Sequence, residues 1–394
     1  MSQQPGHPEP IGRPDPGTDP STDLITGQLT GQQAGPPDPA DYPRKVLFVA
    51  GAGRSGTSTL AVLLQILGLH VPRPEVAADA SNPKGFGEPR WVVDQHDRLL
   101  AEAGVAVGDA RPQAWFETGR LAAREDERAR VASWLAGHLA EDRELVVKDP
   151  RLSWFLGLWR IGAERARAAP VFATMLRPPA EVAGSRERYY NNRLGAAHLT
   201  ASWVNMLLHT ELATRDSTRV FVRYADLLDD WVRTTRHIGE TLGLQHVLDA
   251  RSEAIRDGHR FIDPSLRRIT ATLDDLALPA ALREITAETW TELNELAEPG
   301  GDTADRRGTL DQLLDAYIEL YAEAEAISRS SVVAAAARAG GAAGPPGGTV
   351  DRPRADPGDD GRGRSLADRI PHAWRAKVPP SVRQGVRRAL GRAR

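Results

Sequence analysis

The sequence predicts an α/β domain with three layers, in which helices flank both faces of a central parallel sheet. Short runs rich in Val, Leu and Phe alternate with longer amphipathic stretches through residues 41–331, and this alternation is typical of such a sheet. A glycine-rich turn that begins at Gly51 connects the first apolar run to the first helical stretch. We expect strands at Lys45–Ala50, His70–Val71, Glu144–Lys148, Pro170–Leu176 and Arg219–Arg223.

The helices are expected where apolar residues recur every three or four positions. The predicted ranges are 57–67, 90–103, 123–140, 153–166, 179–190, 196–214, 226–242, 275–297 and 306–330. Parallel sheets bind ligands at the carboxyl ends of their strands, where Gly51, Lys148, Arg177 and Tyr224 fall. Polar groups from distant parts of the sequence are therefore expected to converge on one edge of the sheet.

Composition limits the functional class. The 394 residues carry a formal charge of −3 with a pI of about 6.4, so no overall basic field would attract nucleic acid. Cysteine is absent, which excludes a disulfide framework and thiolate metal sites and makes the cytoplasm the expected compartment. We find no apolar stretch of membrane-spanning length and no signal-peptide pattern at the N-terminus.

Three segments differ in composition from the predicted domain. Residues 1–40 are rich in Pro, Gly, Asp and Thr, with few large apolar residues, so we expect them to be disordered. Residues 332–364 are rich in Ala, Gly and Pro and are expected to form a flexible linker. Residues 365–394 form a basic C-terminal tail with seven Arg and one Lys against one Asp.

Apolar residues of this tail are spaced for one face of a helix, at Val382, Val386 and Leu390. A basic amphipathic helix fits an anionic membrane surface, which would place the protein peripherally on the inner face of the membrane. A solvated tail without a function is the alternative interpretation.

The segment Gly51-Ala-Gly-Arg-Ser-Gly-Thr-Ser-Thr-Leu60 carries the strongest chemical signal. Because it joins a strand to a helix, its backbone N–H groups form an anion-binding nest at the positive helix end. The spacing of Gly51 and Gly56 matches a phosphate loop, but the Lys that should follow is Thr57, and a cation is found instead at Arg54. Kinases use that Lys to bridge the β- and γ-phosphates. Because the Lys is missing here, this P-loop-type fold is better suited to a single phosphate that carries one further anionic group.

These residues resemble a known family. Gly53-Arg-Ser-Gly-Thr-Ser58 is similar to the 5′-phosphosulfate loop of sulfotransferases that use 3′-phosphoadenosine 5′-phosphosulfate (PAPS), with Arg54 at the position of the family's Lys. Downstream, Arg177 follows an apolar run and Ser185 lies eight residues later, which resembles the family's 3′-phosphate motif. The resemblance covers about residues 44–270 and is closest to bacterial carbohydrate-type members.

The resemblance implies how PAPS would be held. Arg177 and Ser185 would bind the 3′-phosphate, which distinguishes PAPS from ATP. Tyr224 aligns with the family's tyrosine near the adenine, and ordinary core packing is its alternative. Arg267 and Arg268 match the family's C-terminal Arg-bearing loop only loosely and are interpreted as residues of a solvated turn. The 5′-phosphosulfate would be bound by Arg54, Ser55, Gly56, Thr57, Ser58 and Thr59.

The base that accepts the acceptor's proton is also expected from the resemblance. Asn82-Pro-Lys-Gly-Phe-Gly-Glu88 resembles the N-P-x-G-x-x-E segment of bacterial carbohydrate-type members, whose Glu is the base. Glu88 is therefore the expected catalytic base, with His96 and His70 as alternatives. Lys148 begins a Lys-Asp-Pro-Arg segment similar to one in the same group. It would neutralise the sulfuryl oxygens together with Arg54, or it would only pair with Asp149 at the strand end.

We therefore expect sulfuryl transfer from PAPS to an acceptor hydroxyl, on a carbohydrate or glycolipid if the resemblance around Glu88 holds. The ten His residues show no recurring ligand spacing, so no metal is expected. A small-molecule kinase with a P-loop and an inert nucleotide-binding or membrane-tethered scaffold are the alternatives. Thr57 in place of Lys disfavours the kinase.

Overall fold

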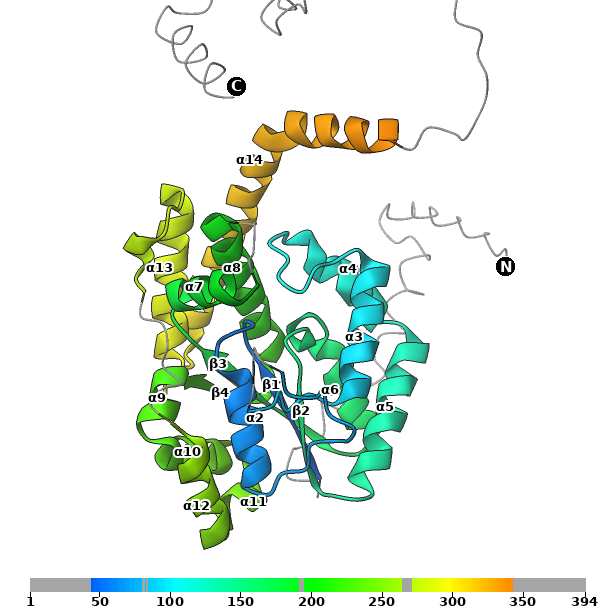
Figure 1. The fold of residues 1–394 in the computed structure, drawn as a ribbon, viewed down its shortest axis with the longest axis vertical. Helices are drawn as coiled ribbons and strands as arrows, with labels where there is room; N and C mark the ends of the chain where they lie inside the picture. Colours follow the sequence, from blue (N-terminus) through cyan, green and yellow to red (C-terminus); the bar gives the residue numbers. More distant parts are fainter. Residues whose placement is uncertain (1–43, 80–81, 83, 191–194, 264–270, 343–394) are drawn as a thin grey trace, which may run out of the picture. The chain divides into compact units, whose positions relative to one another are not determined.

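The computed structural model describes residues 44–342 apart from 80–81, 83, 191–194 and 264–270. Its central sheet has four parallel strands in the order β2-β1-β3-β4 (Figure 1). The predicted parallel sheet is therefore confirmed. The strands are β1 (Lys45–Ala50), β2 (Glu144–Lys148), β3 (Ala169–Leu176) and β4 (Thr218–Arg223).

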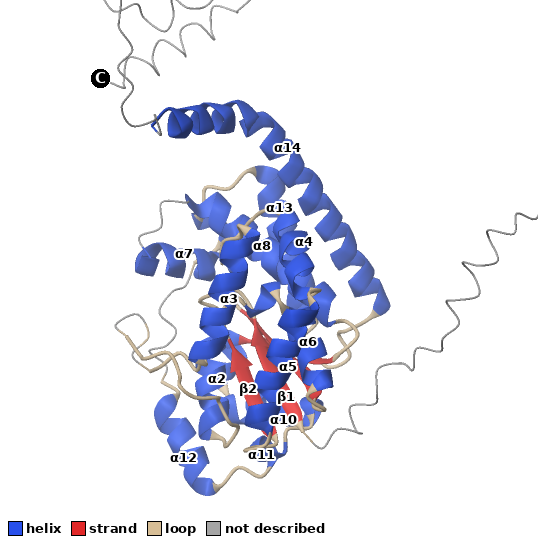
Figure 2. Ribbon diagram, turned by 90° about the vertical axis from the view of Figure 1, so that its right-hand side faces the viewer, coloured by secondary structure: helices blue, strands red, loops and turns tan. Residues whose placement is uncertain are grey.

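Helices enclose this sheet, as Figure 2 shows. Two short 3₁₀ helices, Leu152–Trp154 and Leu273–Asp275, lie between longer elements. The helices are α2 (Thr57–Ile66), α3 (Arg90–Ala103), α4 (Gln113–Ala122), α5 (Glu125–Leu139), α6 (Leu156–Arg165), α7 (Pro179–Tyr190), α8 (Gly195–Thr214), α9 (Tyr224–Asp229), α10 (Trp231–Leu242), α11 (Gln245–Leu248), α12 (Ser252–Phe261), α13 (Ala280–Glu295) and α14 (Ala304–Ala342).

The two faces of the sheet pack against different helices. Successive side chains of a strand point to opposite faces. In β1, Val46 and Phe48 join a buried cluster with residues of α3, α5, α6 and α8. Leu47 and Val49 join a second cluster with residues of α2, α10 and α11. The three layers expected from the sequence are thus confirmed.

The fifth strand expected at His70–Val71 is a wrong prediction. Only His70 pairs, through a single parallel bridge to Leu145 at the start of β2. Pro72 and Pro74 follow at once, and neither has the backbone N–H that a continuing strand would donate. The edge of the sheet beyond β2 is therefore one bridge and not a strand.

Some helix boundaries also differ from the expectation. Helices α4 and α12 lie within stretches where no helix was predicted. The helix expected at 226–242 is divided at Asp230, whose side chain accepts a hydrogen bond from the backbone N–H of Arg233 at 2.9 Å and so caps α10.

Helix α14 extends to Ala342, so residues 332–342 of the expected linker are helical. The run of alanines at 334–337 explains this, because alanine has the highest helix propensity. Residues 1–40, 343–364 and 365–394 lie outside the described residues, and the expectations for them stay predictions. The sheet belongs to the first of two compact units, Met1–Arg329. Among the described helices, none is both long and apolar enough to cross a bilayer.

Candidate active site

The phosphate loop follows β1 and ends at Gly56, the N-cap of α2. Gly56 has a left-handed backbone (φ 95°), and no side chain caps the helix. The first backbone N–H groups of a helix have no partner within it, so those at the start of α2 are open to an anion. Arg54 is also left-handed (φ 76°), which is uncommon for a residue with a side chain and typical of functional turns.

Arg54 meets the predicted 3′-phosphate residues. Its Nε donates to Ser185 Oγ at 3.2 Å, across 131 positions of sequence. Arg177 Nη1 donates to the backbone oxygen of Arg54 at 3.1 Å. The structure thus brings together the two motifs recognised separately in the sequence.

Arg177 has a partner that the sequence analysis missed. Its Nε donates to Glu181 Oε2 at 2.9 Å, and both side chains are nearly buried. Glu181 lies in the first turn of α7, while Arg177 precedes the helix, so local helix spacing alone does not predict the pair. Glu181 orients the guanidinium and would compete with an anion for its charge.

Tyr224 begins α9, directly after β4, and closes the floor of the loop. A Cβ built on Gly56 would lie 2.2 Å from Tyr224 Cδ2, so the ring occupies the space that a side chain there would fill. The Arg177 guanidinium lies 5.0 Å from the ring centroid. Tyr224 is 6% exposed and belongs to the core cluster around α2. The ring therefore packs under the loop, and a position near the adenine stays a prediction.

The expected base and cation form a buried ion pair beside the first turn of α2. Lys148 Nζ lies 2.5 Å from Glu88 Oε1 and donates to Ser58 Oγ at 2.8 Å. The rival partner of Lys148 was Asp149, but the described contacts of Asp149 are with Arg151 and His96. Lys148 therefore joins Glu88 to the phosphate loop.

The segment before α3 brings Glu88 to the loop. Gly87 is left-handed (φ 61°), and a Cβ built there would lie 3.0 Å from that of Ala61 in α2. The backbone oxygen of Glu88 accepts from the N–H of Val76 at 2.8 Å, and Arg90 donates to Pro74 in the same way. The hydrogen bonds join the segment to residues 74–76, and the close approach of Gly87 to Ala61 places it against α2, where Glu88 reaches Lys148.

Burial raises the pKa of Glu88 above its ordinary value, even though the charge and hydrogen bond of Lys148 act in the opposite direction. The negative charge of Asp149 adds to the increase. A carboxylate with a raised pKa binds a proton more strongly than a solvated one. This suits a group that must accept a proton near neutral pH.

The two alternative bases lie elsewhere. His96 is fully buried; its Nε2 accepts from Trp159 Nε1 at 2.7 Å, and its Nδ1 lies 3.6 Å from Asp149. No acceptor hydroxyl could reach it there. His70 pairs with the start of β2, whereas the loop follows the carboxyl end of β1. Arg267 and Arg268 fall outside the described residues.

The remaining loop residues lie in the turn before α2 and in its first turn. Ser55 is buried and donates from Oγ to the backbone oxygen of Ala52 at 2.6 Å, so its hydroxyl braces the loop. Thr57 is buried, while Ser58 and Thr59 are partly exposed in the first turn of α2. Asp149, Arg177 and Tyr224 directly follow β2, β3 and β4. The predicted convergence on one edge of the sheet is therefore observed, while the roles of these residues stay predictions.

Solved structures of sulfotransferase domains are similar to the chain. The sulfotransferase domain from the Synechococcus PCC 7002 olefin synthase matches at 20% identity and a TM-score of 0.39, over 64% of this chain and 96% of that one. The sulfotransferase domain from the curacin biosynthetic pathway matches at 15% identity and a TM-score of 0.36, over 64% and 98%. At TM-scores below 0.5, neither similarity decides the function.

No family model matches the chain, and no curated protein matches its sequence. The carbohydrate-type part of the resemblance is not supported by any of these comparisons.

Proposed function

We propose that this protein transfers a sulfuryl group from PAPS to an acceptor hydroxyl. The contact between Arg54 and Ser185 carries the proposal. It joins a loop suited to a phosphosulfate to a second anion site suited to the 3′-phosphate, and few nucleotides carry both groups. Arg177 links the two sites, because its guanidinium contacts the backbone of Arg54.

In this function the N-terminus of α2 binds the 5′-phosphate through open backbone N–H groups and the hydroxyls of Thr57 and Ser58. Arg54 neutralises charge on the oxygen between phosphorus and sulfur. Arginine suits this role because it stays protonated and offers two donors to phosphate and sulfate oxygens.

Chemistry is assigned to the pair of Glu88 and Lys148. The acceptor oxygen forms a bond to sulfur as the bond from sulfur to the bridging oxygen breaks, and 3′-phosphoadenosine 5′-phosphate (PAP) leaves. Glu88 takes the proton of the acceptor hydroxyl. Lys148, which contacts both Glu88 and Ser58 of the loop, stabilises the charge on the sulfuryl oxygens during transfer.

The acceptor is proposed to be a carbohydrate or glycolipid. Only the similarity of Asn82-Pro-Lys-Gly-Phe-Gly-Glu88 to the corresponding segment of carbohydrate-type members supports this choice. Asn82 holds that segment in a turn by donating from Nδ2 to the backbone oxygen of Gly85 at 2.5 Å.

Melting temperatures with nucleotides test the class of function without requiring the acceptor. PAP should raise the melting temperature of the protein more than equal concentrations of AMP or of ATP with Mg²⁺, since binding to the folded state shifts unfolding by mass action. A larger shift with ATP would favour a kinase, and no shift with any nucleotide would leave only a membrane-tethered scaffold.

Two variants test whether Arg54 takes part in turnover. Arg54→Ala should reduce turnover of PAPS at least about a hundredfold, the scale of losing one preorganised donor to the transition state. Arg236→Ala is the matched control, because this exposed arginine lies on α10 and pairs only with Glu240 among its described contacts. Turnover within a few-fold of wild type for Arg54→Ala would remove Arg54 from the mechanism.

A further inference from the structure

A second cluster of ligand-type side chains lies away from the phosphate loop. His70 pairs with Leu145 at the start of β2, whereas the loop and Lys148 lie at the carboxyl ends of the strands. His138 is in the last turn of α5, and Glu141 follows in the turn that leads to β2. The cluster therefore connects the segment after α2 to the α5–β2 turn.

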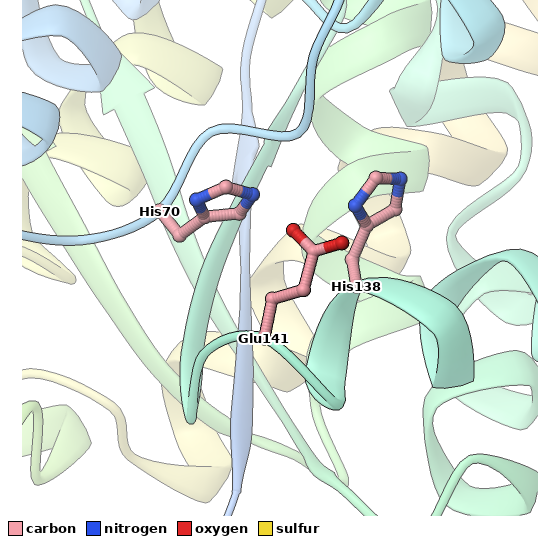
Figure 3. A group of neighbouring side chains, drawn as sticks. All are labelled: His70, His138 and Glu141. Atoms are coloured by element: carbon pink, nitrogen blue, oxygen red, sulfur yellow. The ribbon is translucent and has the colours of Figure 1, made fainter.

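The three side chains point toward one another. One ligand atom from each of His70, His138 and Glu141 lies within 4.8 Å of the others. Figure 3 shows that each ring turns a nitrogen toward the other, with the carboxylate of Glu141 beside both. The ring centroids are 6.0 Å apart, and Trp134 packs edge-on against His138 at 4.8 Å, which restricts its orientation.

Two nitrogens in this cluster are buried without a hydrogen-bond partner: Nε2 of His70 and Nδ1 of His138. An unsatisfied buried polar atom costs about 1–3 kcal/mol, so most such atoms in folded proteins have partners. Two of them facing one shared carboxylate offer their lone pairs to a single ligand between them. A metal cation accepts such lone pairs from both rings and from the carboxylate.

We propose that His70, His138 and Glu141 bind a zinc ion, with water as the fourth ligand. Imidazole nitrogen and carboxylate oxygen are usual ligands of zinc, whereas magnesium and calcium require oxygen ligands. Tetrahedral zinc–ligand bonds place ligand atoms roughly 3.3 Å apart. The side chains, now within 4.8 Å, need only small rotations to reach that spacing.

The proposed zinc site is separate from the proposed sulfuryl-transfer site. It lies at the start of β2, whereas Lys148 is at the carboxyl end of that strand, so the ion takes no part in sulfuryl transfer. The ion links His70, which pairs with β2 through a single bridge, to the α5–β2 turn. It thereby stabilises the outer side of β2. The sequence did not reveal the cluster, because His70 is far along the chain from His138 and Glu141.

Titration of the untagged, metal-stripped protein with Zn²⁺ in a calorimeter tests the proposal. One zinc ion should bind per chain with a micromolar or lower dissociation constant, and the melting temperature should rise. Substitution with Co²⁺ gives a second measurement, because tetrahedral cobalt with these ligands absorbs visible light. Binding of PAP should be the same with and without zinc, which keeps this test separate from that of the proposed function.

The variants decide which residues bind the ion. Glu141→Gln and His138→Gln should each weaken zinc binding at least about tenfold and remove the cobalt absorption. Glu141 is exposed, so its variant should fold even if that of His138 does not. His237→Gln is the matched control, an exposed histidine on α10. Wild-type protein that binds zinc no tighter than Glu141→Gln, or equal weakening by His237→Gln, would overturn the proposal.

Discussion

Glu88 illustrates how a buried side chain can be held in a reactive state. Removal from water raises its pKa, and Lys148 limits that increase by stabilising the carboxylate at 2.5 Å. Ser58 provides a second partner for the ammonium group, so Lys148 has an alternative contact within the loop. A small movement of Lys148 toward the loop would therefore leave Glu88 more basic.

Glu88→Gln should lower sulfuryl transfer by roughly two to four orders of magnitude while PAP binding survives, because glutamine keeps the shape but cannot accept a proton. Glu75→Gln, on the same connection before α3, is the control and should retain activity. In wild type, the ionised base is lost as pH falls through its raised pKa. The acid limb of the rate profile should therefore lie above the ordinary glutamate value of about 4.3. Full activity of Glu88→Gln would mean that another group is the base.

Asp149 shows the opposite shift. Burial alone would raise its pKa, but His96 and Arg151 more than offset burial and hold the pKa down to about 2. Because the folded-state pKa is depressed, this carboxylate stabilises the protein above its unfolded-state pKa, and the stabilisation disappears as pH falls toward 2. The contribution at neutral pH is about 2 kcal/mol.

Urea unfolding of wild type and Asp149→Asn measures that contribution. The free energy of unfolding should be lower for the variant at pH 6, and the difference should shrink by about 2 kcal/mol as the pH approaches 2. A difference that does not change with pH would mean that packing, not charge, accounts for the loss.

At the scale of elements, the strand–loop–helix unit from β1 to α2 was predicted most accurately. Its glycines, its apolar strand and the helix that follows all indicate the same structure, and β1 has the predicted limits. The contact of Arg54 with Ser185 was expected only in outline, as convergence on one edge of the sheet.

Other elements could not be predicted from the local sequence pattern. Helix α4 begins at Gln113 after Pro112, and its limits depend on packing against α3 and α5, which no window of sequence contains. His70 was predicted to lie in a strand from apolar neighbours alone, although Pro72 prevents the ladder from continuing. The pairing of Lys148 with Glu88 likewise depends on how the segment around Gly87 packs on α2.

Gly56→Ala tests the turn that shapes the site. The left-handed backbone (φ 95°) disfavours alanine, and the new Cβ would collide with the ring of Tyr224. Strain and overpacking together should lower the free energy of unfolding by about 2–4 kcal/mol and abolish PAP binding. Gly119→Ala within α4 is the control: a Cβ there meets nothing within 4 Å, so this variant should be slightly more stable. Wild-type melting of Gly56→Ala would show that Tyr224 does not fill this space.

At the scale of the whole molecule, the sheet separates two kinds of chemistry. The carboxyl edge carries the proposed sulfuryl-transfer site, and the start of β2 carries the proposed zinc site. The parallel arrangement explains this separation, because every strand places its carboxyl end on the same edge. Changes at the sulfuryl-transfer site are expected to leave zinc binding unchanged, and changes at the zinc site are expected to leave PAP binding unchanged.

Deletion of residues 365–394 tests the proposed membrane contact. It removes a net charge of +7, from seven Arg and one Lys against one Asp. Because each basic residue near an anionic surface contributes about 1 kcal/mol, binding to vesicles containing phosphatidylserine should be lost. Turnover with a water-soluble acceptor should not change. If the full-length protein does not bind such vesicles at low salt, the tail has no membrane role.

In the proposed function, Arg54, Arg177 and Ser185 together recognise the two anionic groups of PAPS. Calorimetric titration of wild type, Arg177→Ala and the control Arg236→Ala with PAP and with AMP, which lacks the 3′-phosphate, tests it most directly. Wild type and the control should prefer PAP, and Arg177→Ala should lose at least about thirtyfold in affinity for PAP but much less for AMP. Equal loss for both nucleotides, or no preference for PAP in wild type, would contradict the account.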